Sequence, residues 1–162
     1  IAGRPHSMGG PELAFAPSLA REFGVSSMQD STARLCSLVD EVDGDALLFV
    51  GHNGPTGQGS ARGSIWGRDF TTEPGDHGDP DLEAAVAYAK RRGLRVAGVV
   101  AGHMHRGLRG GGQRVSLQQD DGVTYVNAAR VPRIWDEDGR RRRHHVALRW
   151  DGAALRVEEV IW

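Results

Sequence analysis

Three of the seven histidines in this chain, His52, His103 and His105, lie just beyond two apolar runs of strand length, residues 46–50 and 96–101. A glycine separates each run from its first histidine, which allows the backbone to turn sharply there. Neutral imidazole nitrogens bind borderline metal ions such as zinc at about 2.0–2.1 Å. The residue types and their spacing therefore predict a metal-binding edge formed by the ends of two strands.

The pair in Gly-His-Met-His is the more specific signal, because a lone histidine such as His52 is more often a structural residue. In an extended segment, His103 and His105 would point to the same side. On a turning loop, they would instead face two neighbouring ions. Two ions about 3.5–4 Å apart also need bridging carboxylate or water oxygen, so the histidines alone form an incomplete site.

Apolar periodicity predicts the elements that position these histidines. Residues 31–42 have apolar side chains at helical spacing, with Asp30 or Ser31 as the cap. A second helix begins at Pro80 after a capping Asp79. Each helix precedes one apolar run, and this order predicts parallel strands joined by a right-handed crossover. The carboxyl ends of such strands share one edge of a sheet, where α/β proteins bind their ligands.

The remaining segments lack helical periodicity. Residues 1–30 are rich in Gly, Pro and Ser and are expected to be mostly loop. Residues 54–80 form a second aperiodic stretch, and loops of that length are usually functional or disordered. In residues 115–161, short apolar runs are separated by Asp-Gly dipeptides at 121–122 and 151–152, which predicts antiparallel strands.

Composition restricts the class of protein. With 39% hydrophobic and 25% charged residues, the 162-residue chain has the composition of one globular domain. No apolar run approaches the roughly 18 residues of a membrane span, and a net charge of −1 favours neither membrane nor nucleic-acid partners. The single cysteine, Cys36, excludes an internal disulfide, and the first 20 residues lack a signal-peptide pattern. We therefore expect a cytoplasmic protein.

Two motifs carry a resemblance to a known superfamily. Residues 99–105, Val-Val-Ala-Gly-His-Met-His, resemble the final Gly-His-x-His motif of the calcineurin-like metallophosphoesterases. Residues 49–55, Phe-Val-Gly-His-Asn-Gly-Pro, are similar to the single-histidine motif that precedes it there. The likeness to one branch of the superfamily covers nearly the whole chain, and its other parts are residues 3–10, 52–57, 67–69, 78–82 and 125–129.

The resemblance implies a fold and a reaction. The fold is the C-terminal part of a four-layer α/β/β/α sandwich, in which residues 1–162 belong to one domain and a parallel crossover unit precedes antiparallel strands. By resemblance, His52 and His103 bind one divalent ion and His105 binds the other, the ions being manganese, iron or zinc. A metal-bridging hydroxide then hydrolyses a phosphomono- or phosphodiester substrate.

The superfamily's earlier motifs, D-x-H, G-D-x-x-D and G-N-H-D/E, are missing in the required order and context. Residues 75–79 match the letters of the second motif, but they follow Thr-Thr-Glu-Pro instead of an apolar strand, so we expect a loop and a helix cap there. The bridging aspartate, the asparagine ligand and the catalytic histidine are therefore expected upstream. The fragment alone is expected to be inactive.

Several polar residues near the motifs are weaker candidates for binding substrate. Arg62 and Arg68 lie in the long loop, and guanidinium groups match phosphate oxygens, although a solvated arginine is the commoner case. Asn53 follows His52 and either orients it or forms a turn. A structural turn is expected at Asn127, and the other candidate cations are Arg109, Arg130 and Arg133.

Other functions are less well supported. Residues 140–145, four arginines and two histidines, follow three acidic residues and are expected to form a hairpin loop with solvated charge, so nucleic acid is expected only as a substrate. A serine hydrolase would need a G-x-S-x-G elbow, which is missing. A non-catalytic metal-binding or interaction module derived from a phosphoesterase remains the alternative to the enzyme.

Overall fold

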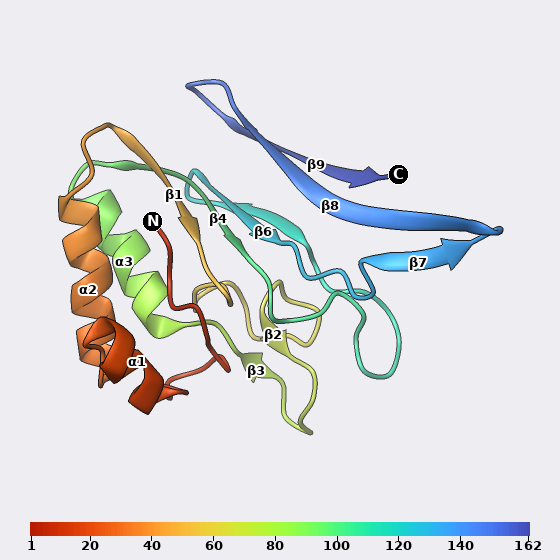
Figure 1. Ribbon diagram of the computed structural model, residues 1–162, viewed down its shortest axis with the longest axis horizontal. Helices are drawn as coiled ribbons and strands as arrows, with labels where there is room; N and C mark the ends of the chain where they lie inside the picture. The colour runs from red at the N-terminus through yellow and green to blue at the C-terminus, as the bar shows by residue number, and fades with distance from the viewer.

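The two apolar runs that precede the histidines form neighbouring parallel strands in the computed structural model, which describes residues 1–162 (Figure 1). β1 (Ala46–Val50) pairs with β4 (Arg95–Ala101), β4 pairs in parallel with β6 (Val123–Asn127), and β5 (Leu117–Asp120) forms the far edge. The sheet order is therefore β1-β4-β6-β5. The predicted helix–strand–helix–strand unit is confirmed, and the protein is a mixed α/β fold with parallel and antiparallel sheets.

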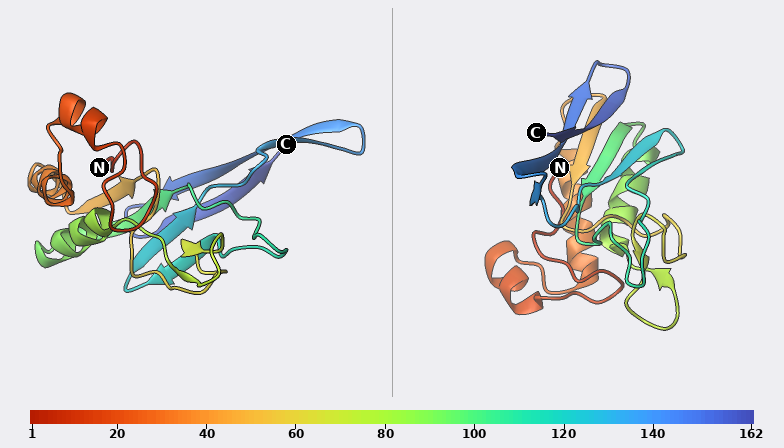
Figure 2. Two further views of the ribbon diagram at one scale, coloured as in Figure 1. Left: turned by 90° about the horizontal axis from the view of Figure 1, so that it is seen from below. Right: turned by 90° about the vertical axis from the view of Figure 1, so that its right-hand side faces the viewer.

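Two helices, α2 (Met28–Asp40) and α3 (Pro80–Arg91), lie side by side and cover one face of this sheet (Figures 1 and 2). Alternate residues of the parallel strands, such as Phe49 and Val99, point toward them and are fully buried. The buried helix residues are those of the expected apolar faces: Leu35, Val39, Leu82, Ala85, Val86 and Ala89. None of the helices is long and apolar enough to cross a membrane.

The predicted start of α2 was wrong by a few residues. Ser27 is the cap, because its hydroxyl accepts from the backbone of Asp30 at 3.1 Å while the Asp30 carboxylate accepts from the backbone of Ser27 at 3.0 Å. This reciprocal capping box places Asp30 and Ser31 inside the helix. Asp79 does occupy the position before α3, but its side chain makes no capping hydrogen bond.

The first 30 residues contain one helix that the sequence did not predict, α1 (Ala16–Phe23). It is short, only Leu19 is buried on it, and Gly24 ends it in a left-handed conformation. So short a helix gives little periodic signal among glycines and prolines. Before it, the chain lies against the outer side of β1, where Gly3 donates to Val50 at 2.8 Å.

The long aperiodic loop is ordered around one buried tryptophan. It contains two short paired strands, β2 (Gly67–Arg68) and β3 (Gly75–Asp76). The Trp66 side chain is fully buried, and it packs so closely on Gly54 that a Cβ there would lie 2.0 Å from the indole ring. Glycine is therefore required at this place in the His-Asn-Gly-Pro stretch.

The last strands form an antiparallel sheet of β7 (Ile134–Glu137), β8 (Arg140–Trp150) and β9 (Leu155–Ile161). Both Asp-Gly dipeptides lie at hairpin turns, as predicted. β6 pairs antiparallel with β5, as expected, and in addition pairs in parallel with β4. One expectation was wrong: residues 140–145 begin β8 instead of forming a loop, and their arginines pair across the strands with acidic residues of β7.

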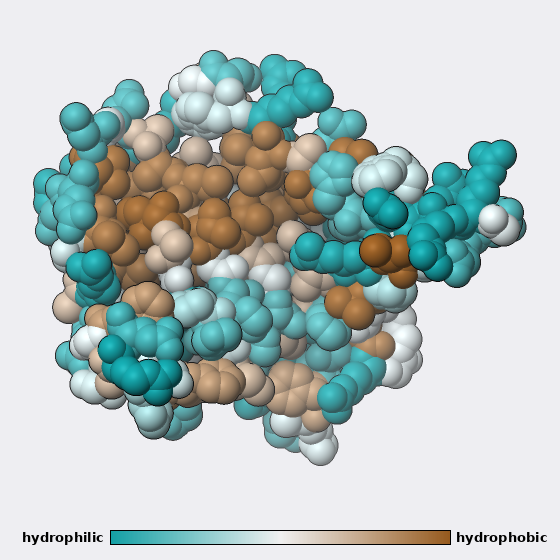
Figure 3. Space-filling model, in the orientation of Figure 1, coloured by the Kyte–Doolittle hydropathy of each residue, from teal (hydrophilic) through white to brown (hydrophobic).

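The face of the four-stranded sheet without helices is turned toward the β8–β9 hairpin. Leu155 of β9 packs over Gly98 of β4, where a Cβ would lie 2.6 Å from the leucine side chain. A broad hydrophobic surface remains visible between β1 and β8 (Figure 3). Val50, the last residue of β1, is 50% exposed although it belongs to the apolar run of residues 46–50.

Candidate metal centre

Backbone hydrogen bonds between the two segments continue just beyond the ends of β1 and β4 and bring two histidines together. Gly51 donates to Val100 at 2.9 Å, and Gly102 donates to His52 at 3.0 Å. The imidazole rings of His52 and His103 consequently meet with their centroids 5.0 Å apart. Their nearest nitrogens, Nε2 of His52 and Nδ1 of His103, are separated by 3.1 Å.

This separation fits two ligands of a single ion. With metal–nitrogen bonds of about 2.0–2.1 Å, two nitrogens 3.1 Å apart subtend an angle of about 100° at the ion, close to tetrahedral geometry. The same distance also fits a hydrogen bond in which one neutral ring donates to the other. His52 and His103 are thus placed to share either a proton or a cation.

Partial desolvation lowers the pKa of both rings, which favours the neutral form that binds metal. Desolvation lowers the pKa of His52, and the nearby His6 lowers it further. Desolvation also lowers the pKa of His103, with smaller contributions from His52, His77 and His105. A cation could therefore bind at neutral pH without first displacing protons from the imidazole rings.

His103 has a backbone conformation that non-glycine residues rarely adopt, with φ at 62°. Met104 donates to Gly102 across this turn at 2.8 Å, and the fully buried Asn127 donates to the Met104 carbonyl, also at 2.8 Å. The Asn127 side-chain oxygen also accepts from the Ala129 backbone at 3.0 Å, which confirms the structural turn expected there. Such strained conformations cost about 1–3 kcal/mol and cluster at functional sites.

His105 lies on the same groove but does not join the pair. Its side chain is exposed, and its carbonyl accepts from Arg114 Nε at 3.0 Å. No group of three or more His, Cys, Asp or Glu side chains is arranged to hold an ion. The pair of His52 and His103 is therefore the nucleus of the candidate centre, and the predicted role of His105 at a second ion stays a prediction.

The groove beside the histidines has a volume of about 460 Å³ and runs from the sheet edge onto the hydrophobic face. Arg133 is its only charged residue, and no carboxylate lines it. The other lining residues are Val50, Gly51, His52, Val100, Ala101, Gly102, His103, His105, Ala128, Ala129 and Val131. Arg133 favours an anionic substrate beside the histidines, and the groove itself supplies no carboxylate oxygen for a dinuclear centre.

No family model, curated protein or solved structure is detectably similar to the chain. The site's own geometry therefore carries the functional assignment.

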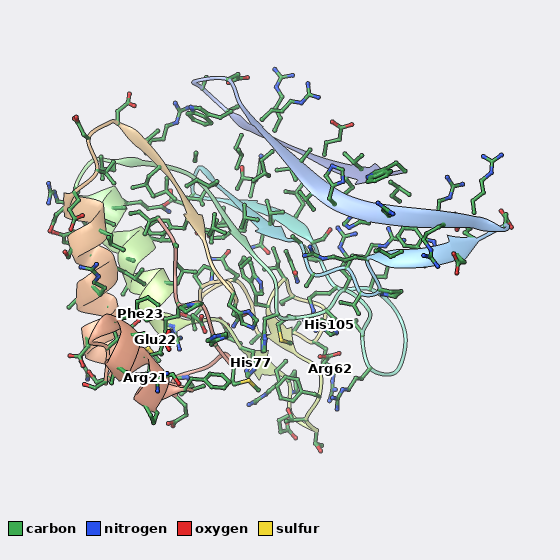
Figure 4. The ribbon with its side chains drawn as sticks, in the orientation of Figure 1. Arg21, Glu22, Phe23, Arg62, His77 and His105 are labelled. Carbon is green, nitrogen blue, oxygen red and sulfur yellow. The ribbon has the colours of Figure 1, made fainter.

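The two loop arginines predicted to bind substrate are engaged in the loop itself. The Arg62 guanidinium donates to the Asp69 and Thr72 carbonyls, and Arg68 packs against Gly75. Figure 4 shows Arg62 in the same part of the molecule as His77 and His105. Substrate binding by these arginines stays a prediction. Of the remaining candidate cations, Arg130 stacks on Trp135 at 4.2 Å and Arg109 lies over Phe70 at 5.9 Å.

A buried polar network lies behind the pair. Asn53 is fully buried, and its amide donates to the His77 carbonyl at 2.7 Å and to Asp79 at 3.4 Å. Arg4 donates to both oxygens of Asp81, at 2.8 and 3.1 Å, and also lies 3.2 Å from Asp79. Asn53 therefore ties the segment after His52 to the loop of His77. It makes no hydrogen bond to the His52 ring, so a role in orienting that ring stays a prediction.

No role was predicted for His77, although its ring lies beside that of His103 with the two centroids 6.0 Å apart. A loop and a helix cap were expected over residues 75–79, whereas Gly75–Asp76 form the short strand β3 and Asp79 precedes α3 without a capping hydrogen bond. The feature that could have pointed to His77 is its place beside a glycine in a long aperiodic loop, since ordered loops of that length are usually functional.

The buried carboxyl group of Asp79 predicts how the stability of the fold changes with pH. Burial raises its pKa to about 6, against the hydrogen bond from Ser7 and the charge of Arg4, which lower it. The folded state then binds this proton more tightly than the unfolded state, so stability is lost as pH rises from about 4 to about 6. Over this pH interval, we expect the free energy of unfolding of Asp79→Asn to fall by about 1–3 kcal/mol less than that of the wild type.

Urea unfolding of both proteins at pH 4 and pH 7 measures this effect. The wild type should lose more stability over the interval than the variant does. Equal pH dependence in the two proteins would show that Asp79 has the same pKa folded and unfolded.

Proposed function

We propose that this chain provides the histidine half of a dinuclear metallophosphoesterase of the calcineurin-like superfamily, which hydrolyses phosphomono- or phosphodiesters. The observation that carries the proposal is the 3.1 Å separation of His52 Nε2 and His103 Nδ1 at the shared end of two parallel strands. The Gly-His-x-His spacing and the lowered pKa of both rings support it. The strained turn at His103 agrees with a functional role for that residue.

Each residue of the edge has a proposed task. His52 and His103 hold one divalent ion, and His105, exposed on the same groove, holds the second. Manganese, iron or zinc ions in these positions supply Lewis-acid activation of water and offset the charge of the phosphoryl oxygens. Arg133 in the groove offers a guanidinium to the phosphate of the substrate.

The missing half of the centre is proposed to come from polypeptide outside residues 1–162. The groove offers no carboxylate, and its floor opens onto a hydrophobic sheet face on which Val50 is half exposed. Exposed apolar surface of this kind marks interaction sites in soluble proteins. A second layer of the domain packed there would bring the oxygen ligands to the histidines and complete the sandwich.

Hydrolysis of bis-p-nitrophenyl phosphate tests the function. The full-length protein with Mn²⁺ is expected to release p-nitrophenol, and His103→Ala is expected to reduce the rate at least about 100-fold, as loss of a group essential to charge stabilisation does. Residues 1–162 alone are expected to show no turnover. Full activity in His103→Ala would remove His103 from the mechanism, and no activity in the full-length protein would favour the non-catalytic binding module.

A further inference from the structure

His103 contacts a second imidazole besides that of His52. The rings of His77 and His103 are stacked at an interplanar angle of 27°, whereas those of His52 and His103 are tilted by 54°. His77 belongs to the loop between β3 and α3, so it comes from neither of the strands that deliver the other two. Three imidazoles from three segments are thus in contact through His103.

The backbone of His77 is fixed from several directions. Its carbonyl accepts from the Asn53 amide at 2.7 Å, and its N–H donates to the Trp66 carbonyl at 3.0 Å. The Phe70 ring meets the His77 ring edge-on at 4.9 Å. Both hydrogen-bond partners are fully buried, so the ring has a defined place and is not a freely moving loop side chain.

The N-terminal loop of residues 7–10 clamps the same ring. Gly9 has φ of 74° and lies so close to His77 that a Cβ would be 2.7 Å from Nε2 and 2.3 Å from the carbonyl oxygen. The loop is held by Ser7, whose hydroxyl accepts from Gly9 at 2.9 Å and donates to Asp79 at 2.5 Å. Hydrogen bonding to the Met8 backbone also raises the pKa of both His77 and His103, against the larger effect of desolvation.

We infer that His77 is a positioning residue, whose flat ring, clamped by Gly9, holds the His103 imidazole with Nδ1 toward His52. This inference rests on the proposed function in that it takes His103 as a metal ligand. Held in this orientation, Nδ1 of His103 stays within hydrogen-bond reach of His52 Nε2, and that hydrogen bond sets the His103 tautomer. Loss of a group that orients a ligating histidine typically costs about 10–100-fold in metal affinity. The inference also gives a role to the Ser-Met-Gly-Gly stretch of residues 7–10, for which the histidines at the strand ends alone suggest none.

Four variants of residues 1–162 separate positioning from other roles. His77→Ala removes the ring, whereas His77→Phe keeps a flat ring without nitrogens. Gly9→Ala drives a methyl group into His77. Gly10→Ala is its control, because Gly10 has nearly the same φ, 76°, but the nearest atom to its Cβ position is His77 Nδ1 at 3.9 Å, an ordinary van der Waals contact. The two glycine variants therefore share backbone strain and differ in the collision.

Two-bond ¹H–¹⁵N spectra of the metal-free variants report which nitrogen of His103 carries the proton, and titration with Zn²⁺ gives the affinity. We expect His77→Ala and Gly9→Ala to change the His103 tautomer and to weaken zinc binding about 10–100-fold. His77→Phe and Gly10→Ala should behave as wild type. The dispersion of the backbone amide signals verifies that each variant is folded.

A wild-type tautomer and affinity in His77→Ala would overturn the inference. So would a loss in His77→Phe equal to that in His77→Ala, because the His77 nitrogens would then act directly as ligands. The tautomer is measured without metal or ester, so the result stands apart from whether the full-length protein hydrolyses phosphate esters.

Discussion

Alanine in place of His103 is expected to lower the zinc affinity of residues 1–162 by more than about 100-fold, the upper end of what loss of an outer-shell partner costs. The reason is the geometry of the pair: Nε2 of His52 and Nδ1 of His103 lie 3.1 Å apart, close enough to bind one ion together. A single remaining imidazole on an exposed edge has no chelate partner. Competition with a fluorescent zinc chelator at pH 7.5 measures the affinity.

His145→Ala is the control for this variant. His145 is an exposed histidine on β8, it contacts Trp162, and it does not line the groove. Its loss should leave zinc affinity within about twofold of wild type, since it contributes no ligand. If His103→Ala and His145→Ala bind zinc equally well, the metal lies somewhere other than at the strand ends.

Leucine in place of Arg4 is expected to destabilise the fold by about 3–5 kcal/mol, because it leaves buried carboxylates without their cation. Arg4 pairs with Asp81 at 2.8 Å and with Asp79 at 3.2 Å, and all three side chains are at least 95% buried. Since Asp79 also accepts from Asn53 and Ser7, the loops that carry His77 and Met8 should loosen as well. Urea unfolding at pH 7 measures the loss.

A surface ion pair of the same length provides the comparison. Arg21 and Glu22 are also 2.8 Å apart, but their side chains are 69% and 55% exposed. Arg21→Leu should change the unfolding free energy by no more than about 0.5 kcal/mol, as exposed pairs usually do. Equal effects of the two substitutions would mean that the Arg4 network does not stabilise the fold.

The parts of the fold that followed from sequence are those with strong local patterns. The runs before His52 and His103 are apolar throughout, and strands covered by helices give that signal. Helix α3 begins at a proline and buries its apolar face as expected. Because the parallel order of these elements follows from the connections, the meeting of His52 and His103 at one edge could be predicted from the sequence alone.

The parts that did not follow depend on contacts between distant segments. Arg4 and Asp81 are 77 positions apart, and no local pattern joins them. His77 lies in a loop without periodicity, so only the folded chain places it against His103. The acidic residues before residues 140–145 are evident in the sequence and suggested a solvated hairpin loop. That they form a strand, β7, which pairs with these arginines across a sheet is evident only in the folded chain.

The central claim is that His52 and His103 hold one cation between them. A crystal of residues 1–162 soaked in Zn²⁺, with data collected on both sides of the zinc absorption edge, tests it directly. If the two histidines bind one zinc ion, we expect an anomalous peak at about 2.0–2.1 Å from both His52 Nε2 and His103 Nδ1. Zinc bound elsewhere, or two rings that still share a hydrogen bond with no peak between them in zinc-saturated crystals, would contradict it.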